Sequence, residues 1–392
     1  MDLWGARLRA AVPPLRVFAG SRLVVWMVAV YAWVWFAPLR LPAGDLGYVT
    51  QVWSRADSNW FLDIARHGYG HNGSGSTVFY PLYPLSIAGL GRALGGYYVT
   101  AGILISLVCG AAAFVLLHRL ALPRLGPEGA SRAVLYLAVF PMSLFLQAVY
   151  SESMFLLCAV SAFLAAERRR WLLAGVAIGL ATLTRIAGVA LFPAILLLAW
   201  RSPERRRAVA SLGIAPLLAG LYPLWLQIKL HAVFAEFSNE AGWNRYVSKA
   251  GPLGGAWHGL QAAWAGLEQL VTGDRTHAFW TASHSDPLYV AAHNLVDFAF
   301  FAGFIALGIV AWRRFGAPYG VYVLGSLAIA ASVPHSSYPL LSVPRFCLTL
   351  FPAFFALASL ATTARRDRIV IVISSVFLAV AVVQWTTGYW VS

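Results

Sequence analysis

The stretch LVVWMVAVYAWVWF, residues 23–36, contains no charged side chain and decides the class of the fold. It is the centre of an apolar run over residues 20–38, close to the ~20 residues that a helix needs to cross a bilayer. Comparable runs recur along the 392-residue chain, in which 60% of the residues are hydrophobic and 11% are charged. Because backbone polar groups inside a bilayer must be bonded within their own segment, these runs indicate helices. We therefore expect an all-α polytopic membrane protein.

The apolar runs predict about 11 transmembrane helices in one domain over residues 1–392. Two long polar segments interrupt them, and both are expected to carry helices that lie at the membrane interface. The first is residues 38–96, whose part 80–94 is re-entrant or interfacial, and the second is residues 230–286. The expected spans are residues 20–38, 97–118, two within 131–166 (broken at Pro141), two within 171–200 (broken near Thr184-Arg185), 208–229, 287–312, 316–332, 343–363 and 368–390.

The formal net charge of +14 comes largely from arginines in short loops between the apolar runs. In a soluble protein this charge would suggest a nucleic-acid partner, but short basic loops are typical of the cytoplasmic side of a membrane protein. We therefore expect a cytoplasmic N-terminus, no nucleic-acid partner, and both long loops on the extracytoplasmic face. Most acidic residues fall on or toward that face, so chemistry is expected there.

A polar, aromatic-rich island follows the first span: WSRADSNWFLDIARHGYGHNGSGSTVFYPLYPL, residues 53–85. Residues 58–67 are predicted to form a short helix, with Asp57 or Ser58 at its N-cap and Gly68 ending it. Titratable side chains that cluster at one face of a bilayer indicate a functional site, so this loop is the candidate site.

Asp57 shares one face of the predicted helix with Trp60, and that face turns toward the membrane interface. Asp63 falls on the other face, where it is spaced to pair with Arg66. An aspartate so placed is a candidate general base. The alternative is that Asp57 only caps the helix.

The motif R-x-D-S-x-W-F-L-x-I-A-x-x-G-Y, starting at Arg55, resembles the bacterial members of the PIG-V family of mannosyltransferases, which belong to the GT-C superfamily. The resemblance extends from about residue 20 to about residue 360. One departure is Ala56, where the family usually has tryptophan before the acidic residue. Four further stretches carry the resemblance: VFYPLYPL (78–85), FPMSLF with AVYSES (140–145 and 148–153), TRIAG (184–188) and SVPRF (342–346).

The resemblance implies a GT-C glycosyltransferase that moves a sugar, expected to be mannose, from a polyprenyl-phosphate carrier to an acceptor hydroxyl with inversion. Asp57 would be the base. The carrier phosphate is itself the leaving group and the loop has no DxD motif, so no metal and no cofactor are expected. The expected partners are the lipid-linked donor (polyprenyl phosphomannose), membrane lipids, and an acceptor that is a glycolipid, a glycan or a protein.

A departing phosphate needs fixed positive charge, and four residues are expected to supply it: Arg185, Arg345, Arg55 and His335. Arg185 and Arg345 are the strongest candidates, because each stands at a span boundary where a helix break frees backbone donors. An arginine buried there is otherwise costly. Lipid-headgroup contacts are the alternative for the arginines, and a plain loop is the alternative for His335.

Four residues are expected to position the substrate: Glu152, Trp60, Asp63 and Tyr83. A carboxylate in an apolar span needs a partner, so Glu152 is also expected to pair with Arg185, and a purely structural ion pair is its alternative. An interfacial anchor is the alternative for Tyr83.

Two other readings stay open at this point. A transporter or flippase for a sugar or a polar lipid would place charged residues at mid-membrane in both halves of the protein. The same transferase reaction could also use another polyprenyl-phosphate sugar. The 29 basic residues include only two lysines, a bias typical of high-GC bacteria, so the bacterial plasma membrane is the expected location.

Overall fold

The computed structural model describes residues 3–36, 46–276, 279 and 286–391, and within them the chain is nearly all helical. Parts of the expected loops 38–96 and 230–286 therefore lie outside the described residues. The helices are α1 (Leu3–Phe36), α2 (Tyr48–Gln51), α3 (Ser58–His67), η1 (Ser74–Val78), α4 (Leu82–Ala93), α5 (Tyr98–Val139), η2 (Pro141–Leu146), α6 (Glu152–Glu167), α7 (Trp171–Thr184), η3 (Ile186–Ala190), α8 (Leu191–Trp200), α9 (Arg205–Leu212), α10 (Ile214–Ala219), α11 (Leu221–Leu230), α12 (Ala235–Ser238), η4 (Asn239–Trp243), α13 (Gly251–Thr272), α14 (Pro287–Phe315), α15 (Ala317–Ser332), α16 (Val343–Cys347), α17 (Phe351–Leu360) and α18 (Ala364–Thr387).

Several of these helices are long and apolar enough to cross a membrane, which confirms the predicted all-α polytopic class. Among the described residues there are five such segments: Ala11–Phe36, Tyr98–Val139, Arg205–Leu230, Pro287–Phe315 and Ala364–Thr387. Four shorter apolar helices accompany them: Trp171–Thr184, Ile186–Trp200, Ala317–Ser332 and Phe351–Leu360. The number of spans, about 11, stays a prediction.

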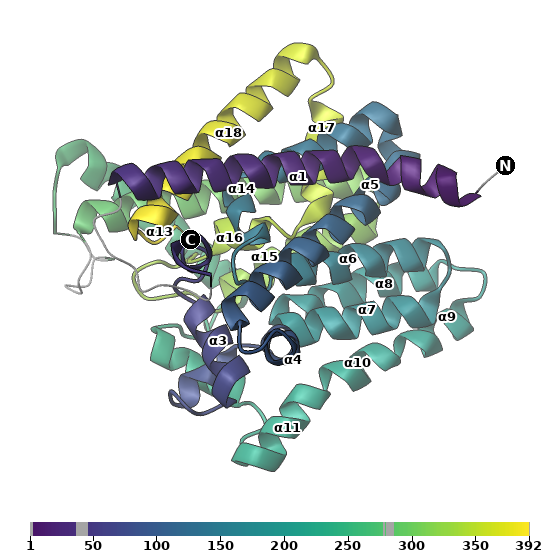
Figure 1. Ribbon diagram of the computed structural model, residues 1–392, viewed down its shortest axis with the longest axis horizontal. Helices are drawn as coiled ribbons and strands as arrows, with labels where there is room; N and C mark the ends of the chain where they lie inside the picture. The colour runs from purple at the N-terminus through teal and green to yellow at the C-terminus, as the bar shows by residue number, and fades with distance from the viewer. Residues whose placement is uncertain (1–2, 37–45, 277–278, 280–285, 392) are drawn as a thin grey trace.

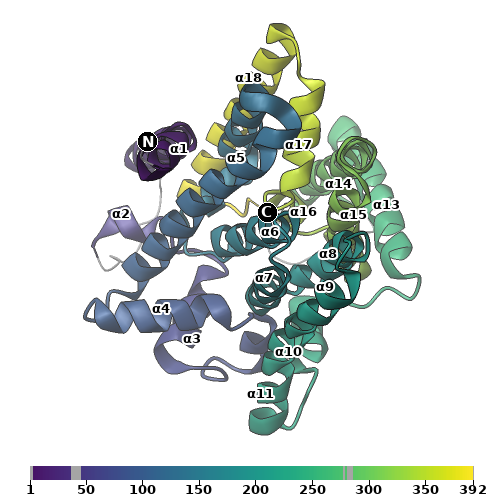
Figure 2. The ribbon, with the colours of Figure 1, turned by 90° about the vertical axis from the view of Figure 1, so that its right-hand side faces the viewer.

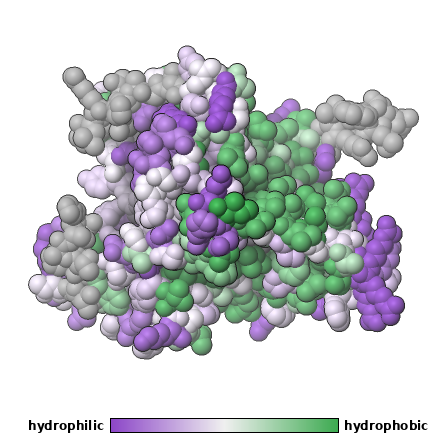
Figure 3. All heavy atoms as spheres, turned by 90° about the horizontal axis from the view of Figure 1, so that it is seen from below, coloured by the Kyte–Doolittle hydropathy of each residue, from purple (hydrophilic) through white to green (hydrophobic). Residues whose placement is uncertain are grey.

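The helices form one bundle (Figures 1 and 2). Helix α1 lies along one side of the bundle and packs against α5 and α18. The loop region with α3 lies at the left of Figure 1, whereas the turn between α8 and α9 lies at the right. Figure 3 shows hydrophobic residues gathered over the middle of one face, with hydrophilic residues toward both sides. This distribution is the one expected of a protein that spans a bilayer.

Two expected boundaries differ from the structure. The spans expected at 97–118 and from 131 are two parts of α5, which kinks at Gly126, where the backbone has φ 68° and ψ 178°. The span expected over 343–363 is divided into the short α16 and α17 by a break at residues 348–350. The break near Thr184 is present as predicted, because α7 ends there and the 3-10 helix η3 follows. The break at residues 348–350 leaves irregular backbone that is buried by protein.

Candidate active site

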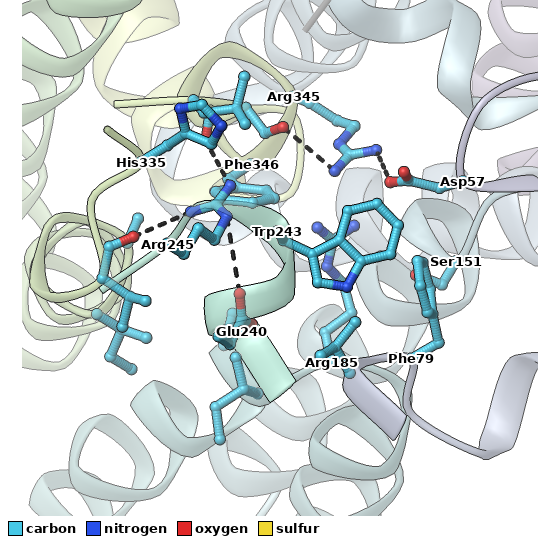
Figure 4. A pocket seen from close by; sticks show the side chains of 18 of the residues that line it. Asp57, Phe79, Ser151, Arg185, Glu240, Trp243, Arg245, His335, Arg345 and Phe346 are labelled. Carbon is cyan, nitrogen blue, oxygen red and sulfur yellow. Dashed lines mark hydrogen bonds and ion pairs between the residues drawn. The ribbon is translucent and has the colours of Figure 1, made fainter. Parts of the chain in front are cut away.

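A cavity of about 750 Å³ opens where α3, α16 and the breaks before α6 and after α7 meet. Its volume falls within the roughly 300–1,000 Å³ that is usual for small-ligand sites. Figure 4 shows charged side chains converging on it from segments far apart in the sequence. Three arginines and four acidic residues are among the lining residues: Arg185, Arg245, Arg345, Asp57, Glu152, Glu236 and Glu240. The cavity therefore holds cations that would suit an anionic ligand together with carboxylates that could accept a proton.

Asp57 sits at the N-cap position of α3, as expected, but its side chain makes no capping hydrogen bond. Its Oδ2 instead accepts a hydrogen bond from Nη1 of Arg345 at 2.7 Å, and its side chain keeps 19% exposure. The capping alternative is therefore wrong for the side chain. The carboxylate faces the guanidinium of Arg345 in the cavity.

The backbone before Asp57 is held in an unusual turn. Ala56 has a left-handed conformation with φ 51°, which costs a non-glycine residue energy and persists only where the surroundings enforce it. The hydroxyl of Tyr150 accepts the N–H of Asp57 at 3.2 Å and donates to the carbonyl of Arg55 at 3.3 Å. Tyr150 thus fixes the backbone turn that places Asp57 at the start of α3. The sequence alone did not single out Tyr150.

Glu152 holds two arginines in the floor of the cavity. Its side chain is fully buried, its Oε1 accepts a hydrogen bond from Nη1 of Arg185, and the same oxygen lies 3.4 Å from Nε of Arg345. The pair that the sequence predicted between Glu152 and Arg185 is present. A buried carboxylate shared by two guanidinium groups orients both of them and is costly to leave without partners. We regard Glu152 as a positioning residue for the two cations.

Arg245 holds the loop that covers the cavity from the other side. It donates to the carbonyls of Val333 and Leu341 at 3.0 and 3.2 Å, and its Nε lies 3.8 Å from Oε2 of Glu240. An isolated β-bridge between Arg245 and His335 ties the same loop to the segment that follows η4. No motif in the sequence indicated this connection.

His335 lies on this loop and lines the cavity, but it is not placed as a cation. Its Nδ1 accepts the backbone N–H groups of Ser337 and Tyr338 at 3.0 and 3.2 Å. Burial, with a smaller contribution from the nearby Arg245, lowers the pKa of His335 to about 4. The expectation that His335 binds phosphate as a cation is therefore wrong near neutral pH. The neutral ring retains one N–H, on Nε2, that could serve as a donor.

We expect His335 to make the folded protein less stable as the pH falls. An unfolded histidine titrates near 6.5, whereas folded His335 titrates near 4, so the unfolded state takes up its proton first between these values. The apparent unfolding temperature in detergent should fall from pH 7 to pH 4.5, and it should fall less in His335→Gln. Equal losses in the two proteins would contradict this assignment.

Aromatic rings form one wall of the cavity. Trp60 stacks on Phe79 with ring centroids 5.8 Å apart and meets Trp243 at 5.3 Å. Phe346 contributes the opposite side, where the Arg185 guanidinium lies 4.9 Å from the centre of its ring. Aromatic faces suit the apolar side of a sugar ring or an isoprenoid chain. Trp60 therefore lines the cavity, and its expected role in positioning a substrate stays a prediction; Trp243 is an additional member of the wall.

Three residues expected at the site are used elsewhere. The Arg55 guanidinium donates to the carbonyls of Trp385 and Thr386 at the end of α18, so it anchors that helix. Tyr83 is fully buried, and its hydroxyl contacts the carbonyl of Gly102 and the hydroxyl of Ser106. Asp63 lies outside the cavity and bonds to histidines rather than to Arg66. Arg55 and Tyr83 bond to groups in other helices, whereas Asp63 bonds to two histidines close in sequence that are about half exposed.

The comparisons with known proteins cover the chain unevenly. The family model described as dolichyl-phosphate-mannose-protein mannosyltransferase matches residues 80–226. No curated protein matches the sequence at a significant level. The expected likeness to the PIG-V family is not tested by these results and stays a prediction.

Several solved structures resemble the chain distantly. The apo oligosaccharyltransferase of Archaeoglobus fulgidus is 14% identical with a TM-score of 0.44, over 96% of this chain and 56% of that one. The same organism's AglB, in complex with an inhibitory peptide and a dolichol-phosphate, is 15% identical with a TM-score of 0.41, over 94% and 56%. ArnT from Cupriavidus metallidurans, bound to undecaprenyl phosphate, is 15% identical with a TM-score of 0.42, over 94% and 78%. All three TM-scores lie below 0.5.

Proposed function

We propose that the protein is a membrane glycosyltransferase of the GT-C type that moves a sugar from a polyprenyl-phosphate carrier to an acceptor hydroxyl. The observation that carries this proposal is the contact between Asp57 and Arg345 inside the cavity. A carboxylate that could accept a proton and a guanidinium that could bind phosphate lie together there, and the proposed reaction needs a group of each kind. The match of residues 80–226 to a mannosyltransferase family model supports the same class.

In the proposed reaction the acceptor oxygen attacks the anomeric carbon from the face opposite the phosphate. The bond between that carbon and the phosphate oxygen breaks, and the phosphate leaves with the electron pair. The acceptor proton moves to the carboxylate of Asp57. Arg345 and Arg185 bind the phosphate oxygens as negative charge grows on them. The single displacement inverts the anomeric centre, and neither a metal nor a cofactor is needed to balance it.

Asp57 is favoured as the base over the other lining carboxylates because it is partly exposed and contacts an arginine that is proposed to bind the phosphate. Glu152 is fully buried and shared by two arginines, and Glu236 is buried. Glu240 is 32% exposed, but it lies beside Arg245 and not beside Arg345 or Arg185. When the donor phosphate replaces Asp57 as the partner of Arg345, the aspartate is released to face the acceptor. Donor binding and activation of the base are thereby coupled.

We further propose mannose as the sugar, a PIG-V-like relationship, and an extracytoplasmic site in a bacterial plasma membrane. The mannose proposal rests on the resemblance of the motifs and on the family match. The orientation is supported by a surface recess beside the turn between α8 and α9. Arg169, Arg170 and Arg207 line this recess. Short basic turns favour the cytoplasm, so the opposite end, with the cavity, would face outward.

The function can be tested with purified protein in lipid nanodiscs. The protein is incubated with radiolabelled polyprenyl phosphomannose and a bacterial membrane lipid extract, and products are identified by mass spectrometry. We expect a mannosylated product in the α configuration together with free polyprenyl phosphate. Parallel reactions with the glucose and arabinofuranose donors measure the preference for the sugar.

A transport function predicts a different result. In sealed liposomes a flippase would move labelled polyprenyl phosphomannose between leaflets without forming a glycosidic bond. Translocation with no transfer to any acceptor in the extract would overturn the proposed reaction. Transfer without translocation would support it.

A further inference from the structure

Asp63, His67 and His71 form a cluster outside the cavity that the proposed reaction does not use. One imidazole nitrogen from each histidine and one Asp63 carboxylate oxygen all lie within 4.8 Å of one another. We propose that this cluster binds a transition-metal ion of the zinc type, which links the end of α3 to the turn that follows it.

The geometry of the three side chains points to a shared ligand. Both Nδ1 atoms lie 2.9 Å from the same oxygen, Oδ1 of Asp63. The two imidazole rings stack with their centroids 4.1 Å apart and an angle of 25° between their planes. His67 follows Asp63 by one helical turn, so its ring lies above the carboxylate. Two imidazole nitrogens thus share one carboxylate oxygen.

A second, independent observation is the other oxygen of the same carboxylate. Asp63 is 8% exposed, and its Oδ2 has no hydrogen-bond partner among the described residues. A buried carboxylate oxygen without a partner is expensive. A bound cation would neutralise the carboxylate and engage this oxygen. Arg66 does not compensate, because its guanidinium lies over the ring of Tyr98 at 5.4 Å.

The local chain is shaped to bring His71 back to the helix. Gly68 ends α3 with φ 87°, and Gly70 follows with φ 88°, a conformation that favours glycine. The N–H of Gly70 donates to Oγ of Ser76, which in turn donates to the carbonyl of Gly73. The turn is therefore fixed by its own hydrogen bonds before any ion arrives.

The donor set selects the kind of ion. Imidazole nitrogens with a carboxylate suit zinc, copper or nickel, whereas calcium and magnesium prefer sites made of oxygen atoms alone. A tetrahedral ion with bonds of roughly 2.1 Å separates its ligands by about 3.4 Å, so the two 2.9 Å contacts must open by about half an ångström. His67 and His71 are 47% and 51% exposed and have room to rotate. Their exposure leaves a fourth position to water.

The ion would act on the cavity by holding the helix that carries Asp57. Helix α3 has Asp57 at its first end and the cluster at its last. The turn after α3 leads through η1 to Phe79, which stacks on Trp60 in the cavity wall. The proposed ion would thus link helix α3 to the turn that leads to Phe79. It lies outside the cavity, and it does not depend on the proposed reaction.

Direct binding of zinc to the purified protein tests the proposal. The protein is prepared in detergent without a histidine tag, stripped with a chelator and titrated with Zn²⁺ in competition with a chromogenic chelator. We expect one ion per chain and a rise in the apparent unfolding temperature. Single variants His67→Ala and His71→Ala should weaken binding by about 100-fold or more, beyond the tenfold or larger loss usual for outer-shell partners.

The matched control is His231→Asn, which removes an exposed imidazole elsewhere with a residue that tolerates the left-handed conformation of His231. It should bind zinc as the wild type does. Size-exclusion profiles establish that each variant is folded. Absence of stoichiometric binding in the wild type, or wild-type affinity in both single variants, would overturn the proposal and leave a hydrogen-bonded cluster only.

Discussion

The Asp57→Asn variant is expected to lose sugar transfer by on the order of 10²–10⁴-fold, the usual contribution of a general base. The asparagine side chain has nearly the same shape but cannot take the acceptor proton. It also removes the negative charge 2.7 Å from Arg345. The donor phosphate then no longer competes with a carboxylate for this guanidinium, so donor affinity should stay the same or rise.

This split between turnover and donor affinity separates a base from a structural residue. Turnover is measured with labelled polyprenyl phosphomannose, and donor affinity by equilibrium binding of the unlabelled lipid. The matched control is Glu268→Gln, the same carboxylate-to-amide change at an exposed position on α13, which should leave both quantities unchanged. Wild-type turnover in a folded Asp57→Asn protein would contradict the assignment of Asp57 as the general base. Loss of donor binding together with turnover would instead make Asp57 a positioning residue.

The helix that carries Asp57 could be predicted closely because its signals are local. Its predicted range, 58–67, agrees with α3, and the predicted terminator Gly68 follows it. The face shared by Asp57 and Trp60 also holds, since both line the cavity. Capping residues, apolar periodicity and glycine act within a few residues of one another, so a single sequence contains this information.

The partners of the polar groups could not be predicted in the same way. Arg345 and Asp57 are separated by 288 positions, and Arg55 meets the end of α18 across 330 positions. Which of several arginines reaches a given carboxylate depends on how the helices pack, and composition and spacing do not specify that packing. The pair of Glu152 and Arg185 was predictable because each stands beside a break in an adjacent apolar run.

Irregular connections were the least predictable part of the site. The sequence offers a plain loop as the alternative role for the segment around His335, yet Arg245 and a β-bridge fix this segment against the residues after η4. The sequence suggests His335 as a cation. In the folded loop, however, its Nδ1 accepts two backbone N–H groups, which requires an unprotonated Nδ1. Backbone hydrogen bonds of this kind leave no signal in residue types, so a histidine's protonation state follows from the fold.

Replacement of Arg345 is the second change with a large expected effect, and it tests the anion site. Arg345→Met should lower transfer by about 10²–10³-fold, the cost of removing one donor that stabilises developing charge. Donor affinity should fall together with turnover, unlike in Asp57→Asn, because this guanidinium would contact the phosphate in both the ground and the transition state. Arg345→Lys keeps the charge but loses the planar fork, so its activity should lie between those of the wild type and the methionine variant.

A loss of stability in Arg345→Met could also lower transfer activity. A second substitution in the same ion-pair cluster separates this cause from the loss of phosphate binding. Arg345→Met leaves Glu152 with Arg185 as its remaining charged partner, so we expect a stability loss of about 1–3 kcal/mol, typical of an incompletely satisfied buried group. Adding Glu152→Gln removes the buried charge and should restore part of that stability. Because the double variant still lacks the guanidinium beside Asp57, its transfer activity should stay low. Recovery of activity along with stability would show that Arg345 acts by supporting the fold and that the phosphate is bound elsewhere.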